Sequence, residues 1–205
     1  DEFDIIVKGR GGHAAIPDLA IDPVIIASQI INAAQTIISR TTSPIDKALI
    51  SFTIVNAGTA YNVIADEVLL GGTVRTFKKE TRKLIEKKLH DLSKAIAQAN
   101  GGDIEFIYKS GYPPTINSKE ESIFAGNVAK DLVGGDNVNT EVEPSMGGED
   151  FSYFLDKKPG SYLYIGQHDE NHKAHLHTTR YDFNDNLLPL GVNFWVELVK
   201  KFFNR

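Results

Sequence analysis

The order of hydrophobic patterns in the first half of the chain constrains its fold most. Two helical patterns, one over residues 23–39 and one ending at 101–102, alternate with short apolar or alternating runs typical of strands. These runs lie at 3–9, 48–55, 67–77 and 103–108. The order strand, helix, strand, strand, helix, strand is that of a split βαββαβ, ferredoxin-like domain. We therefore expect a four-stranded antiparallel sheet with both helices on one face, spanning residues 1–113.

Residues 114–205 carry a weaker sheet signal. "SKEE" (118–121) resembles a capping box that starts a helix, and a last helix is expected from about 185 to 203. That last helix is apolar around most of its circumference, so it should be buried. Strands are expected only near 138–142 and at 161–166, and two strands cannot form an independent sheet. We therefore expect an α+β chain whose residues 114–205 are the C-terminal part of a larger α/β domain.

Composition excludes several classes of partner. The net charge is −5 and no block of lysine and arginine occurs, which argues against nucleic-acid binding. No apolar run approaches the roughly 20 residues that cross a bilayer, so no membrane partner is expected. The absence of cysteine is compatible with a reducing compartment, and we expect a cytoplasmic protein.

Four of the six histidines lie within ten residues, at 168, 172, 175 and 177. Imidazole is the commonest metal ligand in proteins, and four could in principle form a self-contained site. However, His168 and His172 lie among charged and amide side chains, as in a solvated loop. His177, just before the apolar last helix, is the best placed. Because zinc needs four ligands, or three and a water, His177 would depend on ligands from elsewhere.

Three polar residues of the first half are candidates for chemistry. His13, among three glycines in "GRGGHAAIP", could donate a hydrogen bond to a developing oxyanion, although a solvated loop histidine is the commoner case. Arg75 alternates with Val74, so it should project from the open face of the sheet, where a guanidinium suits a carboxylate or a surface ion pair. Asn62, near a turn, could offer its amide or simply serve the backbone.

Two features of the chain bear on its second half. Gly147 and Gly148 precede Glu149 and Asp150, which could mean a helix start or a ligand-facing loop. Met146 is the only methionine, so the chain begins without an initiator. Removal of a start residue or a leader would explain this, and so would a cut within a larger protein.

Five motifs in one register resemble a known family. They are "VKGRGGHAAIPDLAIDP", "TAYNVIADEVLLGGTVRTF", "YPPTIN", "GGEDFSYF" and "LHTTRYDFND". They resemble the metal-dependent amidohydrolase branch of the aminoacylase and carboxypeptidase family, whose relatives include hippurate hydrolases, N-acetyl-diaminopimelate deacetylases and auxin-conjugate hydrolases. The resemblance implies an α/β catalytic domain with two metal ions and an inserted split-βαβ lid that forms a homodimer.

The resemblance also implies roles for single residues. His177 would be a metal ligand. His13 would polarise the scissile carbonyl, often in the partner subunit's site, and Asn62 would assist it. Arg75 would hold the substrate carboxylate, and Gly147 and Gly148 would line the substrate pocket.

The family's other metal ligands and its general-base glutamate precede the lid, where this chain begins. We therefore expect a C-terminal fragment that is inactive alone, from a parent enzyme that hydrolyses N-acyl amino acids with two divalent ions (Mn, Zn, Ni or Co). A metallo-carboxypeptidase or dipeptidase of the same family is an alternative. A non-enzymatic ligand-binding or dimerisation module is another.

Overall fold

The computed structural model describes residues 1–204 and confirms a mixed α+β chain. The chain divides into two compact units. The first contains Asp1–Pro114 together with the short segment Met146–Glu149, and the second contains the other described residues. Each unit is described by itself below.

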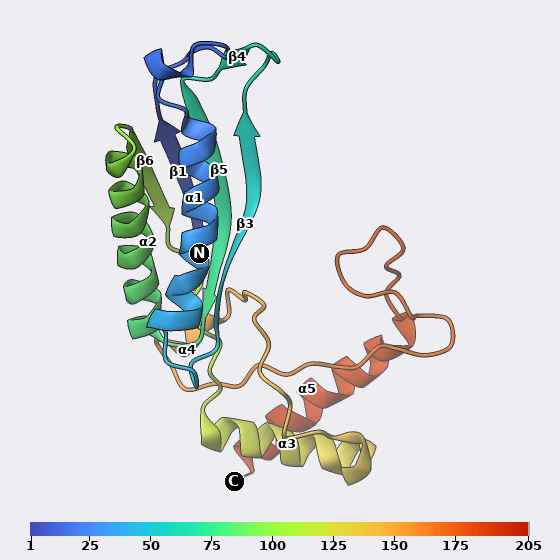
Figure 1. Cartoon of the computed structure of the whole chain (residues 1–205). Coiled ribbons are helices and arrows are strands. Elements are labelled where there is room, and N and C mark those ends of the chain that lie inside the picture. Colours follow the sequence, from blue (N-terminus) through green and yellow to red (C-terminus); the bar gives the residue numbers. More distant parts are fainter. Residues whose placement is uncertain (205) are drawn as a thin grey trace. The chain divides into compact units, whose positions relative to one another are not determined.

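The first unit is built on a four-stranded antiparallel sheet in the order β3-β5-β1-β6 (Figure 1). Its strands are β1 (Glu2–Lys8), β3 (Ala48–Ala57), β5 (Glu67–Thr76) and β6 (Asp103–Lys109). The helices α1 (Pro23–Thr36) and α2 (Lys79–Ala99) follow β1 and β5 in the chain. Two-residue strands β2 (Gly12–His13) and β4 (Val63–Ile64) form a separate antiparallel ribbon. The element order and sheet are those expected from the hydrophobic patterns.

The core lies between the sheet and the two helices. Alternate residues of β1 and β5 are buried there, because successive side chains of a strand point to opposite faces. The helices contribute residues spaced three and four apart. The largest fully buried side chains of this cluster are Phe3, Ile5, Val7, Ile26, Ile30, Val68, Leu70, Val74, Ile85 and Leu89. Both helices therefore cover the same face of the sheet and leave the opposite face uncovered by helices (Figure 1).

Local signals define α1 well and β3 less well. The Asp22 carboxylate accepts a hydrogen bond from the Val24 N–H at 2.9 Å, and Pro23 occupies the first turn, as expected from the sequence. The helix ends at Thr36 and continues as a π-helical turn, η2 (Ile37–Thr41). In β3 a bulge between Phe52 and Ile54 shifts the register, so Ile54 is 44% exposed and the predicted alternation fails there.

The second unit contains α3 (Lys119–Val133), a single turn α4 (Ser152–Leu155) and α5 (Leu188–Phe203). Short 3-10 turns lie at η3 (Gly135–Asn137) and η4 (Asp185–Leu187), and a third, η1 (Pro17–Leu19), belongs to the first unit. The strands predicted at 138–142 and 161–166 are not formed. A strand is held by hydrogen bonds to a neighbour, and no described segment of this unit provides one.

Two further expectations for the second unit were wrong. The Ser118 hydroxyl does not cap α3, because it accepts a hydrogen bond from the Gly160 N–H at 3.1 Å instead. The last helix is not buried: α5 has no buried residue, although Phe202 meets Phe124 of α3 with ring centroids 6.4 Å apart. Of the described helices, α3 packs against α5, and much of the apolar circumference of α5 stays exposed. The most exposed large apolar side chains of α5 are Leu188, Val192, Trp195, Val199, Phe202 and Phe203.

None of the described helices combines the length and the apolar character needed to cross a membrane.

Candidate functional site

The β2–β4 ribbon brings two of the candidate residues together at one end of the sheet (Figure 1). His13 pairs with Val63, and the Ala14 N–H donates to the Asn62 carbonyl at 3.0 Å. His13 and Asn62, 49 positions apart in sequence, therefore lie on adjacent backbone segments. Both side chains are exposed.

Glycine makes this end of the sheet possible. The Gly11 N–H donates to the Asp66 carboxylate at 2.8 Å, and a Cβ at Gly11 would lie only 2.8 Å from the Ile64 carbonyl oxygen. Any side chain there would collide with the neighbouring backbone. The glycines before His13 thus allow the two backbone segments of the ribbon to approach closely. The backbone that carries the exposed imidazole is therefore held in place by pairing.

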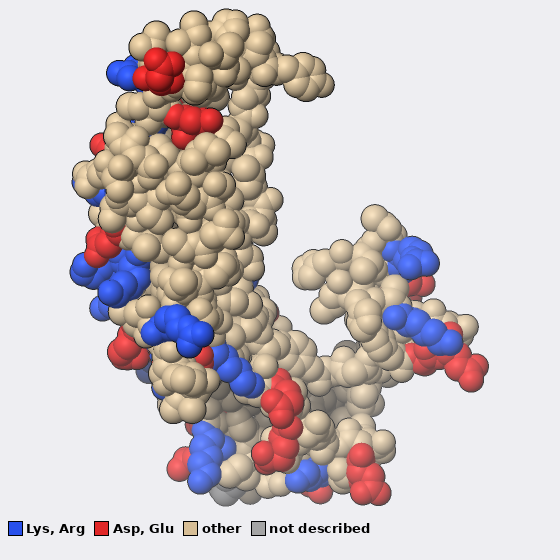
Figure 2. All heavy atoms as spheres, viewed as in Figure 1, with Lys and Arg blue, Asp and Glu red and all other residues tan. Residues whose placement is uncertain are grey.

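The same end of the sheet presents apolar side chains to solvent. Tyr61 is fully exposed and Leu19 is 66% exposed, and about half of Ile16 and of Val63 is exposed. We call these four residues, with His13 and Asn62, the tip. Figure 2 shows lysine and arginine interspersed with acidic side chains over the viewed face rather than gathered into one basic patch.

Arg75 and Gly148 form a second group, at the other end of β5. Arg75 is half-buried and alternates with the buried Val74, so it belongs to the face that the helices leave open. Its side chain has no hydrogen-bond or ion-pair partner among residues 1–204. A Cβ built on Gly148 would lie 3.2 Å from Arg75 Nη1 and 3.1 Å from Tyr112 Cδ2. The segment Met146–Glu149 therefore passes directly against the guanidinium.

These two groups are far apart within one copy of the chain. Asp66 adjoins the tip, and Arg75 lies nine positions further along the chain. At a strand rise of about 3.3 Å per residue, the tip and Arg75 lie about 30 Å apart.

The buried carboxylate of Asp1 binds the segment that precedes Tyr112, and the sequence patterns did not predict this contact. The Asp1 side chain is only 3% exposed and forms an ion pair with Arg82. It also accepts hydrogen bonds from Tyr108 Oη at 2.7 Å and from the Gly111 N–H at 2.8 Å. Burial raises the pKa of Tyr108 to about 12, so its hydroxyl remains a donor to this carboxylate. The signal was hidden because the four residues are scattered over 111 positions.

His177 lies in the second unit and is exposed. It is the one non-glycine residue of the described chain with a positive φ, 61°. That left-handed conformation costs an L-residue about 1 kcal/mol and concentrates at functional positions. Within residues 1–204 no three His, Cys, Asp or Glu side chains gather into a metal site. The four clustered histidines therefore do not assemble a site of their own, although the rings of His168 and His175 meet with centroids 5.2 Å apart.

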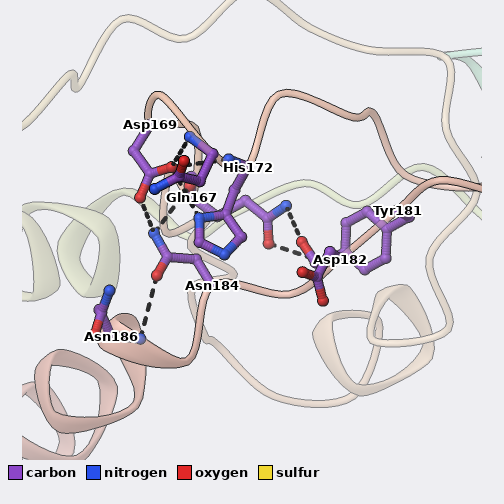
Figure 3. Close-up of polar contacts among 8 residues, drawn as sticks. Gln167, Asp169, His172, Tyr181, Asp182, Asn184 and Asn186 are labelled. Carbon is purple, nitrogen blue, oxygen red and sulfur yellow. Dashed lines mark hydrogen bonds and ion pairs between the residues drawn. The ribbon is translucent and has the colours of Figure 1, made fainter.

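A network centred on Asp169 closes the loop that carries His177 (Figure 3). The Asp169 carboxylate accepts from the His172 N–H and the Asn171 N–H, each at 2.8 Å, and pairs with His172 Nδ1 at 2.8 Å. These bonds, those to His172 foremost, lower the pKa of Asp169 to about 2. The buried Asn184 donates to Asp169 Oδ2 at 3.0 Å and to the Gln167 carbonyl at 3.2 Å. Both ends of the loop are therefore tied together.

Comparison with known proteins defines the class. The family model described as peptidase family M20/M25/M40 matches residues 8–201. The chain therefore belongs to this peptidase family. It is 38% identical over 202 residues to a hippurate hydrolase of Campylobacter jejuni, covering 98% of this chain and 52% of that protein. It is 36% identical over 193 residues to an N-acetyldiaminopimelate deacetylase of Enterococcus faecalis, covering 93% and 50%.

A solved structure agrees with these relatives. The Bacillus subtilis protein YXEP, a dinuclear metal-binding peptidase of family M20, has 29% sequence identity and a TM-score of 0.75. The match covers 96% of this chain and 48% of that one. The chain thus spans about half the length of the relatives it matches. The relatives named above are a hydrolase and a deacetylase.

Proposed function

We propose that this chain acts within a full-length enzyme that hydrolyses the amide bond of N-acyl amino acids. The observation that carries the proposal is Arg75, a half-buried guanidinium without a described acidic partner, with Gly148 against it. A cation in this state suits a ligand carboxylate. Hippurate and N-acetyldiaminopimelate, named for two relatives, are both N-acylated amino acids with a free carboxylate.

In this proposal Arg75 binds the substrate carboxylate, and Gly147 and Gly148 line the same place. Glycine is suited to it, because a Cβ at Gly148 would already press on Arg75 Nη1 at 3.2 Å. A charge-assisted hydrogen-bonded pair of this kind contributes about 2–3 kcal/mol, or roughly 30- to 150-fold in binding.

His13 polarises the scissile carbonyl, and Asn62 assists it by offering its side-chain amide. In an N-acyl amino acid the amide carbon and the carboxylate carbon are one residue apart, about 3.6 Å. His13 and Arg75 of one copy are about 30 Å apart. They therefore cannot act on the same substrate molecule within one copy.

A homodimer resolves this separation. In a two-fold dimer, His13 and Asn62 of one copy reach the Arg75 of the other, and two equivalent composite sites result. The exposed apolar side chains of the tip, Tyr61 and Leu19 among them, support this arrangement, since an exposed apolar patch of this kind marks a contact surface.

For metal binding, the chain offers one fitting ligand, the exposed imidazole of His177 on its tied loop. Since no described cluster completes a site, the other ligands of a two-metal centre come from outside residues 1–204. Two bound divalent ions, whether Mn, Zn, Ni or Co, supply an activated water. The described residues hold and orient the substrate and donate to its carbonyl oxygen.

The two units fit two domains of such an enzyme. Residues 1–113 correspond to the lid that dimerises, and residues 114–205 to the C-terminal portion of the catalytic α/β domain. The uncovered apolar face of α5 supports this division, because a core helix of a larger domain would look this way when its neighbours are left out. In this proposal residues 1–204 alone are inactive, because no described group of His, Cys, Asp or Glu side chains completes a metal site.

The test is substrate hydrolysis by the full-length protein loaded with divalent metal. Release of free amino acid from N-benzoyl- and N-acetyl-amino acids is measured beside that from dipeptides. Faster turnover of the N-acyl amino acids supports a deacylase, and faster turnover of dipeptides favours the peptidase alternative. The variant His177→Ala should abolish turnover. Arg75→Ala should raise KM on substrates with a free carboxylate, and an equal loss on carboxyl-blocked substrates would contradict its role.

A further inference from the structure

The backbone of the tip holds the ring of His13 in a particular way. The Ala15 N–H donates a hydrogen bond to His13 Nδ1 at 3.1 Å. The same turn is closed by the Ile16 N–H, which donates to the His13 carbonyl at 2.8 Å, and the Ala14 N–H is bonded to the Asn62 carbonyl. The backbone N–H groups of the three residues after His13 thus all donate hydrogen bonds, two of them to His13 itself.

This contact determines which ring nitrogen carries the proton. A backbone N–H can only donate, so the nitrogen that accepts from Ala15 must present its lone pair. In a neutral imidazole the other nitrogen, Nε2, then bears the hydrogen. Nε2 has no hydrogen-bond partner within residues 1–204, and the side chain is exposed. The ring therefore offers solvent, or a partner, a single N–H donor and no basic atom.

We propose that the Ala15 N–H is a positioning group that fixes His13 as the neutral Nε2–H tautomer, so that His13 serves as a hydrogen-bond donor to an amide carbonyl oxygen. The use of that donor rests on the proposed function. A ring with its lone pair occupied can polarise a carbonyl and stabilise the charge that develops on its oxygen. It cannot act as the base that activates water, so the geometry separates these two roles.

The tautomer is tested directly on the whole chain, labelled with nitrogen-15 in histidine and alanine. Long-range proton–nitrogen spectra at alkaline pH distinguish protonated from unprotonated ring nitrogens, and the signals of His13 are those lost in His13→Gln. We expect an unprotonated Nδ1, a protonated Nε2 and a coupling across the hydrogen bond between Ala15 N and His13 Nδ1. A dominant Nδ1–H form, or absence of that coupling, overturns the proposal.

A matched pair of variants tests the role of Ala15. Ala15→Pro removes the N–H, and Ala15→Gly keeps it. Imidazole in water already favours the Nε2–H form modestly, so the expected result is a measurable Nδ1–H population in Ala15→Pro and none in Ala15→Gly. Identical spectra for the two folded variants would refute the positioning role. If Ala15→Pro does not fold, the coupling measured in the unaltered chain decides.

Activity separates this inference from the proposed function. In the full-length enzyme, Ala15→Pro should lower kcat roughly tenfold relative to Ala15→Gly, with KM unchanged. If His13→Ala leaves activity intact, the catalytic use of His13 fails while the tautomer assignment stands. If His13→Ala abolishes activity but the Nδ1–H form dominates, the proposed function stands and the role of Ala15 fails.

Discussion

The separation of His13 and Arg75 gives a quantitative prediction for mixed dimers of the full-length enzyme. Loss of one oxyanion donor costs about 100- to 1000-fold in kcat, so His13→Ala should retain roughly 1% of activity or less. Loss of the carboxylate partner costs roughly 30- to 150-fold, so Arg75→Ala should retain a few per cent or less of kcat/KM. The two groups lie about 30 Å apart in one copy, so in the proposed homodimer they serve one substrate only from different copies.

The perturbation is a heterodimer that contains one His13→Ala copy and one Arg75→Ala copy. The two are co-expressed with different affinity tags and isolated by two successive purifications. One composite site then carries both substitutions and the other carries neither. We expect about half the activity of the wild-type dimer, because one of two symmetric sites is intact. The assay is kcat/KM for an N-acyl amino acid at substrate concentrations below KM.

A second heterodimer reverses the expectation and controls for dimer stability. It pairs a wild-type copy with a copy that carries both His13→Ala and Arg75→Ala. Each composite site then has one substitution, so only a few per cent of activity should remain. If both residues serve a site within one copy, the outcomes exchange: the first heterodimer is nearly inactive and the second retains about half. That exchange would refute the reasoning from the length of β5.

Three other predictions concern stability and ionisation. Arg82→Ala should destabilise the first unit by about 3 kcal/mol, because it leaves the buried Asp1 carboxylate without its ion-pair partner, and unchanged urea unfolding by circular dichroism would contradict this. The Asp169 carboxylate has a pKa of about 2, below the ordinary 3.8, so its bonds should stabilise the loop above about pH 4 and be lost as pH falls through 2. A carbon-13 titration midpoint near 3.8 would disprove that. Gly9→Ala should destabilise by about 1–3 kcal/mol or more, because its Cβ would lie 2.2 Å from the Ile21 carbonyl oxygen, whereas wild-type urea stability would show that this backbone yields.

The first unit could be predicted from sequence because its signals are local. Period-two and period-3.6 patterns specify which faces of β1, β5, α1 and α2 are apolar, and one sheet with two helices satisfies all of them. The bulge near Ile54 was not predicted, because a bulge inserts one residue without altering the composition of the run. The second unit fared worse, because its expected strands need hydrogen-bond partners that its described residues do not provide.

For the candidate site, local chemistry predicted single residues, but the contacts between distant residues could not be predicted. Gly148 and Arg75 were each singled out by local chemistry, but only the folded chain shows that they touch, 73 positions apart. The Asp1 network was invisible, because no local pattern connects an aspartate with an arginine 81 positions later. The bond from Ala15 to the ring of His13 is local, but alanine carries no sequence signal for the use of its backbone N–H.

The left-handed backbone of His177 has a consequence for the evolution of its loop. Glycine adopts a φ of 61° without strain, so a glycine at this position should relieve about 1 kcal/mol while removing the imidazole. Stability alone would therefore favour the replacement, and only a function of the ring would oppose it. A large library of variants can be selected first for folding and then for turnover. At position 177, glycine should be enriched over histidine in the first selection, and only histidine should survive the second.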